Sequence, residues 1–287
     1  MKYSKNIGSY IPDQFNKGVP LTYRLFGLVV PKKIGEWNRL YSRLFMALMK
    51  KEDMYYSVPK DNVIRVNQPV IYKENLLPSK LVHHFIDEAN VHAIAKFCMC
   101  RTKMKCKNYP KTFGCLLMGK GVADVSPKLV DHVTREEAHQ YAEKVREQGL
   151  VHMIGRTYAD TLGFRWGKDA GKYHKKFMIV CNCCSCCCLT RIYPYATQAM
   201  KDMIKKIPGV LVQIKETCVG CSTCYNAKVC MFDAIRIKNG KANKTEDCVG
   251  CGRCVEVCPE NAIEVTINKD SIITAVDHLS KLVDLKD

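Results

Sequence analysis

A repeated cysteine run constrains this chain more than any other feature. Its two copies begin thirty residues apart, in the segments TCVGCSTC and DCVGCGRC. Three thiolates spaced two residues apart can wrap around a small iron–sulfur cube, and the fourth thiolate has to come from elsewhere in the chain. One further cysteine follows each copy, Cys230 after the first and Cys258 after the second. The runs themselves consist of Cys218, Cys221 and Cys224, and of Cys248, Cys251 and Cys254.

Residues of about 210–268 resemble the bacterial two-cluster [4Fe-4S] ferredoxins, in which the fourth cysteine of each run serves the other cluster. The repeat extends beyond the cysteines, because MFDAIRI is echoed by PENAIEV. The resemblance implies two clusters and two ligand sets, Cys218, Cys221, Cys224 with Cys258, and Cys248, Cys251, Cys254 with Cys230. The chain departs from the family between Cys224 and Cys230, where five residues replace three. Two zinc knuckles are the alternative use of eight thiolates, but Pro259 and the repeat favour the ferredoxin pattern.

The stretch CNCCSCCC at residues 181–188 holds six further cysteines in eight positions. A core rarely needs so many adjacent small side chains, so buried inert thiols are the weaker interpretation. Within the stretch, Cys181, Cys184 and Cys187 repeat the CxxCxxC spacing and predict a further cluster. The other three cysteines, which overlap this spacing, are Cys183, Cys186 and Cys188.

Four more cysteines precede that stretch in a looser pattern, Cys98, Cys100, Cys106 and Cys115. The ten N-terminal cysteines allow two more [4Fe-4S] clusters, one cubane beside structural thiols, or a larger non-cubane assembly. We favour two further clusters, with spare thiols as hydrogen-bond donors to them. The N-terminal half loosely resembles uncharacterised iron–sulfur proteins of anaerobes that carry CxCR and CxCCxCCC elements, a resemblance that implies no particular activity.

Composition agrees with metal or redox centres in a reducing compartment. The chain has eighteen cysteines in 287 residues, whereas disulfide-rich scaffolds are usually small and secreted. The sequence contains no signal peptide and no apolar run long enough for a bilayer, which predicts a cytoplasmic protein. The formal charge of +17 counts every cysteine as neutral, and cluster thiolates would remove part of it. The remainder predicts an acidic redox protein as donor or acceptor. Nucleic acid is not expected as a partner, because no recognition module is present.

The order of elements predicts an α+β fold, with a C-terminal ferredoxin-like two-cluster domain joined to an N-terminal mixed α/β cysteine-rich domain. The expected units are an arm (1–60), the cysteine-rich domain (61–206), the two-cluster domain (207–270) and a closing helix (271–287). Pro208–Gly209 is the clearest break between domains. Within the arm, residues 34–50 form an expected amphipathic helix, which docks on the core or contacts a partner or membrane surface.

Further elements follow from periodicity and capping signals. Helices are expected from Ser79 to about Phe97, after the cap residue Thr134, and over residues 195–207. Strands are expected at residues 62–66, 69–72, 150–155 and 176–180, the last running directly into CNCCSCCC. The pair Asn239–Gly240 predicts a tight turn between strands.

These features predict an iron–sulfur electron-transfer protein or subunit, which passes single electrons along several clusters between redox partners. No acid–base constellation, phosphate loop or dinucleotide fingerprint is visible. One alternative is a reductase whose N-terminal cluster acts on a small substrate and is fed by the ferredoxin domain. A second is a redox-responsive nucleic-acid regulator, motivated by the excess of Lys and Arg.

Overall fold

The structure, a computed structural model, describes residues 46–65, 77–165 and 169–286. Its largest element is a seven-stranded sheet in the order β5-β3-β4-β7-β6-β1-β8. Neighbouring strands run antiparallel, except for the parallel pair β1 and β8. The strands are β1 (Met54–Val58), β3 (His92–Ala95), β4 (Leu116–Met118), β5 (Val130–Val133), β6 (Val151–Arg156), β7 (Met178–Cys183) and β8 (Ile204–Lys206).

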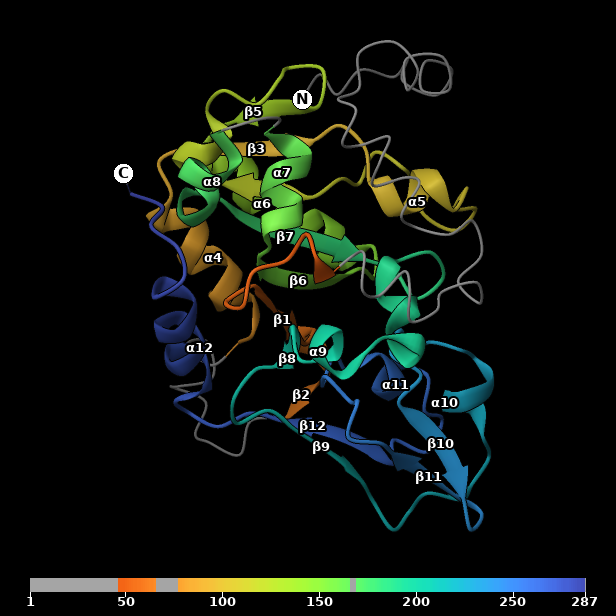
Figure 1. Cartoon of the computed structure of the whole chain (residues 1–287). Helices are drawn as coiled ribbons and strands as arrows, with labels where there is room; N and C mark the ends of the chain where they lie inside the picture. The colour runs from red at the N-terminus through yellow and green to blue at the C-terminus, as the bar shows by residue number, and fades with distance from the viewer. Residues whose placement is uncertain (1–45, 66–76, 166–168, 287) are drawn as a thin grey trace.

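The two faces of this sheet pack against different cores, as the alternation of side chains along a strand requires. Ile154 and Val180 are register partners and belong to the core that α4 (Ser79–Glu88) and α6 (Arg135–Glu147) help to form. Met153 and Cys181, one residue along each strand, belong to a separate core on the other face. The helix α12 (Ser271–Ser280) packs against α4 at the side of the molecule (Figure 1).

The C-terminal part contains two small sheets at the other end of the molecule (Figure 1). In one sheet, β12 pairs with β9 antiparallel and with β2 in parallel, and the other is the hairpin β10–β11. Asn239 and Gly240 have φ values of 52° and 66°, so the predicted tight turn is confirmed. The elements are β2 (Ile64–Arg65), β9 (Leu211–Ile214), β10 (Ile235–Lys238), β11 (Lys241–Lys244), β12 (Ile263–Thr266), α10 (Thr223–Asn226) and α11 (Arg253–Glu256).

Short helices connect the remaining strands. They are α5 (Met99–Lys103), α7 (Tyr158–Phe164), α8 (Asp169–Tyr173), α9 (Gln198–Lys201) and the 3-10 helices η2 (Asp61–Val63), η5 (Lys120–Val122), η6 (His174–Lys176) and η7 (Leu189–Tyr195). Within the described ranges, no helix is long and apolar enough to span a membrane.

Several predicted elements are confirmed. Thr134 and Glu137 form the capping box that begins α6. The strands expected at 150–155 and 176–180 are β6 and β7, and the closing helix is α12. The expected strand at 62–66 is reduced to β2. The expected strand at 69–72 and most of the expected helix at 34–50 lie outside the described residues.

Two predicted helices are wrong over part of their length. The helix from Ser79 ends at Glu88, and β3 follows within the range expected to be helical. All four residues of β3 are buried, and a fully buried strand has the same continuous apolar pattern as a buried helix. The helix expected over 195–207 is limited to α9, because Ile204 and its neighbours pair with β1 instead.

Three structural observations bear on the predicted division into domains. Residues 54–58, assigned to the arm, form β1 inside the large sheet. β2 comes from the N-terminal half but completes the sheet around β12. Val212 and Ile263 also share one core with Ile154, so a continuous core crosses the break at Pro208–Gly209.

Candidate metal centres

Seven of the ten N-terminal cysteines line a cavity of about 180 Å³. We call six of them the cavity thiols: Cys98, Cys100, Cys115, Cys181, Cys183 and Cys188; the seventh, Cys184, also belongs to a second group described below. Cys181 and Cys183 reach it because they lie on the same face of β7, while Cys98 and Cys100 come from the start of α5. Cys115 donates to Cys181 over an Sγ–Sγ distance of 3.5 Å.

The cavity thiols modulate one another's acidity. A hydrogen bond from Cys100 lowers the pKa of Cys98 to about 7. Hydrogen bonds from Cys100 and Cys183 hold the pKa of Cys188 well below its ordinary value, although its burial opposes this. The thiolate is the form of cysteine that binds metals. Hydrogen bonds with neighbouring thiols raise the pKa of Cys100, Cys181 and Cys183, so Cys98 and Cys188 are the cavity thiols that favour the thiolate form.

The rest of the cavity wall is mostly apolar, with one buried acid group. Met153, Ile179 and Phe164 contribute to the apolar part. The hydroxyl groups of Tyr55 and Thr157 both donate to the Asp160 carboxylate. Burial raises the pKa of Asp160 from its ordinary value.

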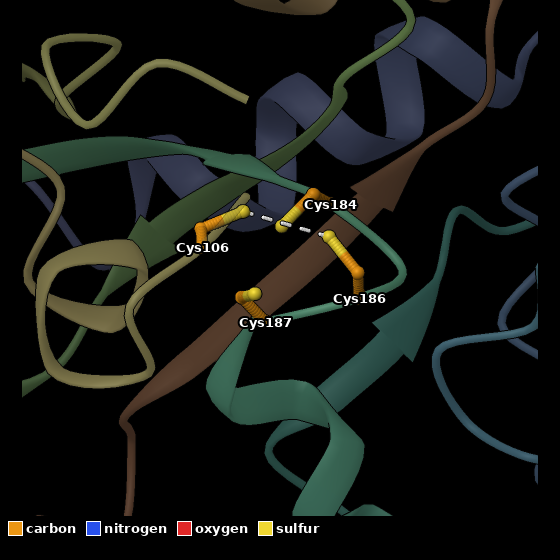
Figure 2. A group of neighbouring side chains, drawn as sticks. All are labelled: Cys106, Cys184, Cys186 and Cys187. Carbon is orange, nitrogen blue, oxygen red and sulfur yellow. Dashed lines mark hydrogen bonds between the residues drawn. The ribbon is translucent and has the colours of Figure 1, made fainter. Parts of the chain in front are cut away.

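A second group of four cysteines, which includes Cys184 of the cavity wall, lies beside the cavity. We call them the Cys106 set: Cys106, Cys184, Cys186 and Cys187. Their sulfur atoms all lie within 4.8 Å of one another, and the Sγ atoms of Cys106 and Cys186 are 3.6 Å apart. Figure 2 shows the four side chains converging on one point from two separate segments of the chain. Cys184 and Cys187 are buried, whereas Cys106 and Cys186 are partly exposed.

The structure places Cys181, Cys184 and Cys187 in two overlapping groups. Cys181 lies in β7 and Cys184 directly follows this strand, and both line the cavity. Cys181 meets Cys115 there, while Cys184 and Cys187 also belong to the Cys106 set. The overlapping cysteines that obscured the spacing in the sequence are divided between the two groups.

The first cysteine run of the C-terminal part surrounds a small hollow. Four cysteines line it, and we call them the first ferredoxin set: Cys218, Cys221, Cys224 and Cys258. Cys221 is exposed and Cys224 is buried. The backbone N–H groups of Ala242 and Ala262 donate to the sulfur atoms of Cys218 and Cys258, at 3.4 and 3.3 Å.

The remaining four cysteines form the second ferredoxin set: Cys230, Cys248, Cys251 and Cys254. Burial, with the nearby thiols of Cys230 and Cys248, raises the pKa of Cys251 to about 12. The N–H of Ala234 donates to the Cys230 sulfur at 3.2 Å, four residues along, just as Ala262 donates to Cys258. The structure thus brings Cys258 to the first run and Cys230 to the second, as the ferredoxin resemblance implies.

The second ferredoxin set lies against the cavity thiols. Cys248 and Cys251 share one apolar core with Cys181, Cys183 and Cys188. The buried Arg253 guanidinium links the two parts, because it donates to the carbonyl oxygens of Gly149 at 2.6 Å and of Cys183 at 3.5 Å. On its other side, the second set adjoins the first, since the Cys224 thiol contributes to raising the pKa of Cys254.

Sequence reasoning missed the arginines that join these groups. Arg101 is 1% exposed, and it donates to the carbonyl oxygen of Asn182 at 2.8 Å and to that of Phe113. Its place directly after Cys100, in the CxCR element, was the available signal. His174, which lies near the cysteines in sequence, pairs instead with Asp53 at 3.0 Å.

Comparison with known proteins agrees with the C-terminal geometry. Residues 244–264 match the family of 4Fe-4S binding domains. The chain is 40% identical over 52 residues to a dihydromethanopterin reductase (acceptor) of Methanosarcina mazei, covering 17% of this chain and 22% of that protein. It is 44% identical over 45 residues to an uncharacterised protein of Methanocaldococcus jannaschii, covering 16% of this chain and 12% of the relative. The chain thus spans less than a quarter of either relative. No solved structure matches it.

Proposed function

We propose that this chain is an iron–sulfur electron-transfer protein, in which the first ferredoxin set, the second ferredoxin set and the cavity thiols form a series of adjoining redox centres. Clusters bound by these cysteines would supply one-electron chemistry. The observation that carries the proposal is the contact between the second ferredoxin set and the cavity thiols through one core and Arg253. The protein would accept an electron from a donor and pass it to an acceptor, so it would return to its starting redox state.

The residues of the two ferredoxin sets fit [4Fe-4S] clusters. Each set supplies four thiols, and N–H groups of the chain point at the sulfur atoms of Cys218, Cys230 and Cys258. Such hydrogen bonds stabilise thiolate and tune cluster potentials. Gly220 and Gly250 occupy matching positions in the two cysteine runs. Both have a left-handed backbone conformation, so both runs bend in the same way.

The second set is less accessible to water than the first set. Cys251 and Cys254 are buried, whereas Cys221 is exposed. Next to the first set, Val219 and Tyr225 are 66% and 45% exposed, an apolar rim of the kind that docks protein partners. We therefore propose that a redox partner docks at the first set. The formal charge of +17 favours an acidic partner.

The test is a reductive titration of the anaerobically purified full chain. The wild-type protein should take up several electrons one at a time. The double variant Cys248→Ser/Cys251→Ser should lose about four iron atoms, the content of one cubane, and take up fewer electrons. The exposed variant Ile273→Ser is the control and should match the wild type. Wild-type protein that contains zinc and no iron, or that takes up no electrons, would refute the proposal.

The cavity favours a second candidate function, a reductase. An apolar cavity of about 180 Å³ beside cysteine ligands has room for a small ligand, and Asp160 with Tyr55 supplies protons at its wall. One relative bears the name of a reductase over a short match. Consumption of a small oxidant with a chemical electron donor, in the absence of a second protein, would favour this function over a carrier.

A further inference from the structure

We propose that the Cys106 set binds a single tetrahedral metal ion, zinc or iron, and not a cluster; its ligands are Cys106, Cys184, Cys186 and Cys187. This site is distinct from the adjoining redox centres, and the inference stands whether or not the protein transfers electrons.

The sulfur–sulfur distances set the number of metal atoms. Four thiolates about 2.3 Å from one ion lie about 3.8 Å from one another in a tetrahedron. The sulfur atoms of the Cys106 set lie within 4.8 Å of one another, and the pair Cys106–Cys186 is 3.6 Å apart. A cubane holds each thiolate on a different iron at the outside of its core, so its ligand sulfurs must lie farther apart.

The rest of the chain supplies an internal comparison. Across residues 46–65, 77–165 and 169–286, the Cys106 set is the one group of three or more potential ligands with such close spacing. No three sulfurs of the first or second ferredoxin set approach one another as closely, and the ferredoxin resemblance assigns a cubane to each of those sets. The structure therefore contains two kinds of four-cysteine site.

The surroundings of the Cys106 set suit a charged thiolate complex. Four thiolates around a divalent ion carry a net charge of about −2, from formal charges. The buried Arg101 guanidinium lies near Cys184, and the backbone N–H groups of Asn108 and Tyr109 lie near Cys106. Lys105 has a φ of 50°, the left-handed turn that brings Cys106 back toward the strand ends. A cation and oriented N–H groups stabilise anionic sulfur.

Such an ion would act as a clasp between two segments. Cys106 belongs to the segment 98–115, and the other three ligands belong to the loop after β7. The segment 98–115 and the end of β7 with the loop after it supply all six cavity thiols. A closed four-thiolate site stabilises structure without an open position for substrate. The ion would thus fix the shape of the cavity that lies beside it.

The test is metal and sulfide analysis of the anaerobically purified full chain. The double variant Cys106→Ser/Cys186→Ser changes the two partly exposed ligands, and Ser185→Ala, in the same loop, is the matched control. The variant should lose about one metal atom per chain with no loss of acid-labile sulfide, as a single-ion site requires. Loss of about four iron atoms with about four sulfides would show a cubane and overturn the proposal. Loss of no metal would also overturn it.

Native mass spectrometry of the wild-type protein tests the same inference without a variant. The mass added to the apo chain should include one zinc or iron atom that sulfide does not accompany, and mild removal of that atom should leave the other increments in place. If every metal atom leaves together with sulfide, the Cys106 set does not hold a single ion. The mass of the ion distinguishes zinc from iron.

Discussion

Arg101 is the residue that joins the two cysteine-bearing segments of the N-terminal part. Arg101 lies in α5. Its guanidinium donates to the carbonyl oxygens of Asn182, in β7, and of Phe113. Burial alone would lower its pKa, but the adjacent thiols, Cys98 first, outweigh burial and raise the pKa above its ordinary value. The guanidinium thus stays charged and offsets the thiolates around it.

We expect Arg101→Met to destabilise the protein by at least about 2 kcal/mol, because two buried carbonyl groups lose a charged donor. Arg101→Lys keeps the charge but cannot donate to both carbonyl groups as the planar guanidinium does. The stability of Arg101→Lys should therefore lie between that of Arg101→Met and that of the wild type. The measurement is urea unfolding of the anaerobic holoprotein. If Arg101→Met unfolds at the wild-type urea concentration, Arg101 does not join the segments.

His152 should make the stability of the protein sensitive to acid. The side chain is fully buried, its ring nitrogens have no hydrogen-bond partner among the described residues, and burial holds its pKa well below the ordinary value. The folded state keeps it neutral, whereas the unfolded state protonates it below about pH 6.5. The unfolded state then binds more protons, so stability falls by about 1.4 kcal/mol per pH unit below that value.

The variant His152→Leu should remove this sensitivity. The difference in free energy of unfolding between His152→Leu and the wild type should shift in favour of the variant as the pH falls below about 6.5. Above that pH the difference should be constant. The exposed His132→Leu is the control and should follow the wild type at every pH. Parallel curves for His152→Leu and the wild type would contradict the account.

At the scale of elements, the loop after β9 is fixed against the β10–β11 hairpin. A Cβ added at Gly220 would lie 1.8 Å from the Gly240 carbonyl oxygen, so no side chain fits there. Gly220→Ala should therefore displace the loop that carries the first ferredoxin set and lower the iron content. Gly240→Ala is the matched control, since both glycines have positive φ but a Cβ at Gly240 meets nothing within 4 Å.

Gly240→Ala should cost only the strain of a left-handed alanine, about 1 kcal/mol, and should keep its iron. Iron analysis and thermal unfolding compare the two variants. Equal iron content in Gly220→Ala and the wild type would show that the close approach of loop and hairpin does not hold the first set.

Local signals predicted some elements well and failed where tertiary structure decides. The Thr134–Glu137 capping box and the Asn239–Gly240 turn are confirmed because each signal is complete within a few residues. The strand β3 was assigned to a helix, because burial on both faces removes the alternation that marks a strand. The spacing of Cys181, Cys184 and Cys187 did not show that Cys184 and Cys187 lie close to Cys106, because Cys106 lies far away in the sequence.

At the scale of the whole molecule, the order of the cysteine groups is the result that sequence could not supply. The ferredoxin resemblance specified how Cys230 and Cys258 exchange between runs. It contained nothing about the N-terminal neighbour of the second set, since the core shared by Cys251 and Cys183 joins residues far apart in sequence. The continuous core through Ile154 and Ile263 makes this arrangement a fixed feature of the fold.

The most direct test of this account is electron paramagnetic resonance of the fully reduced, anaerobically purified full chain. Centres that adjoin one another interact magnetically, so the spectrum should show broadened and split signals from the second ferredoxin set and the N-terminal centre. These interactions should disappear in Cys248→Ser/Cys251→Ser, while the signal of the N-terminal centre remains. A wild-type spectrum that equals the sum of isolated centres, or that contains no iron–sulfur signal from the N-terminal part, would contradict the account.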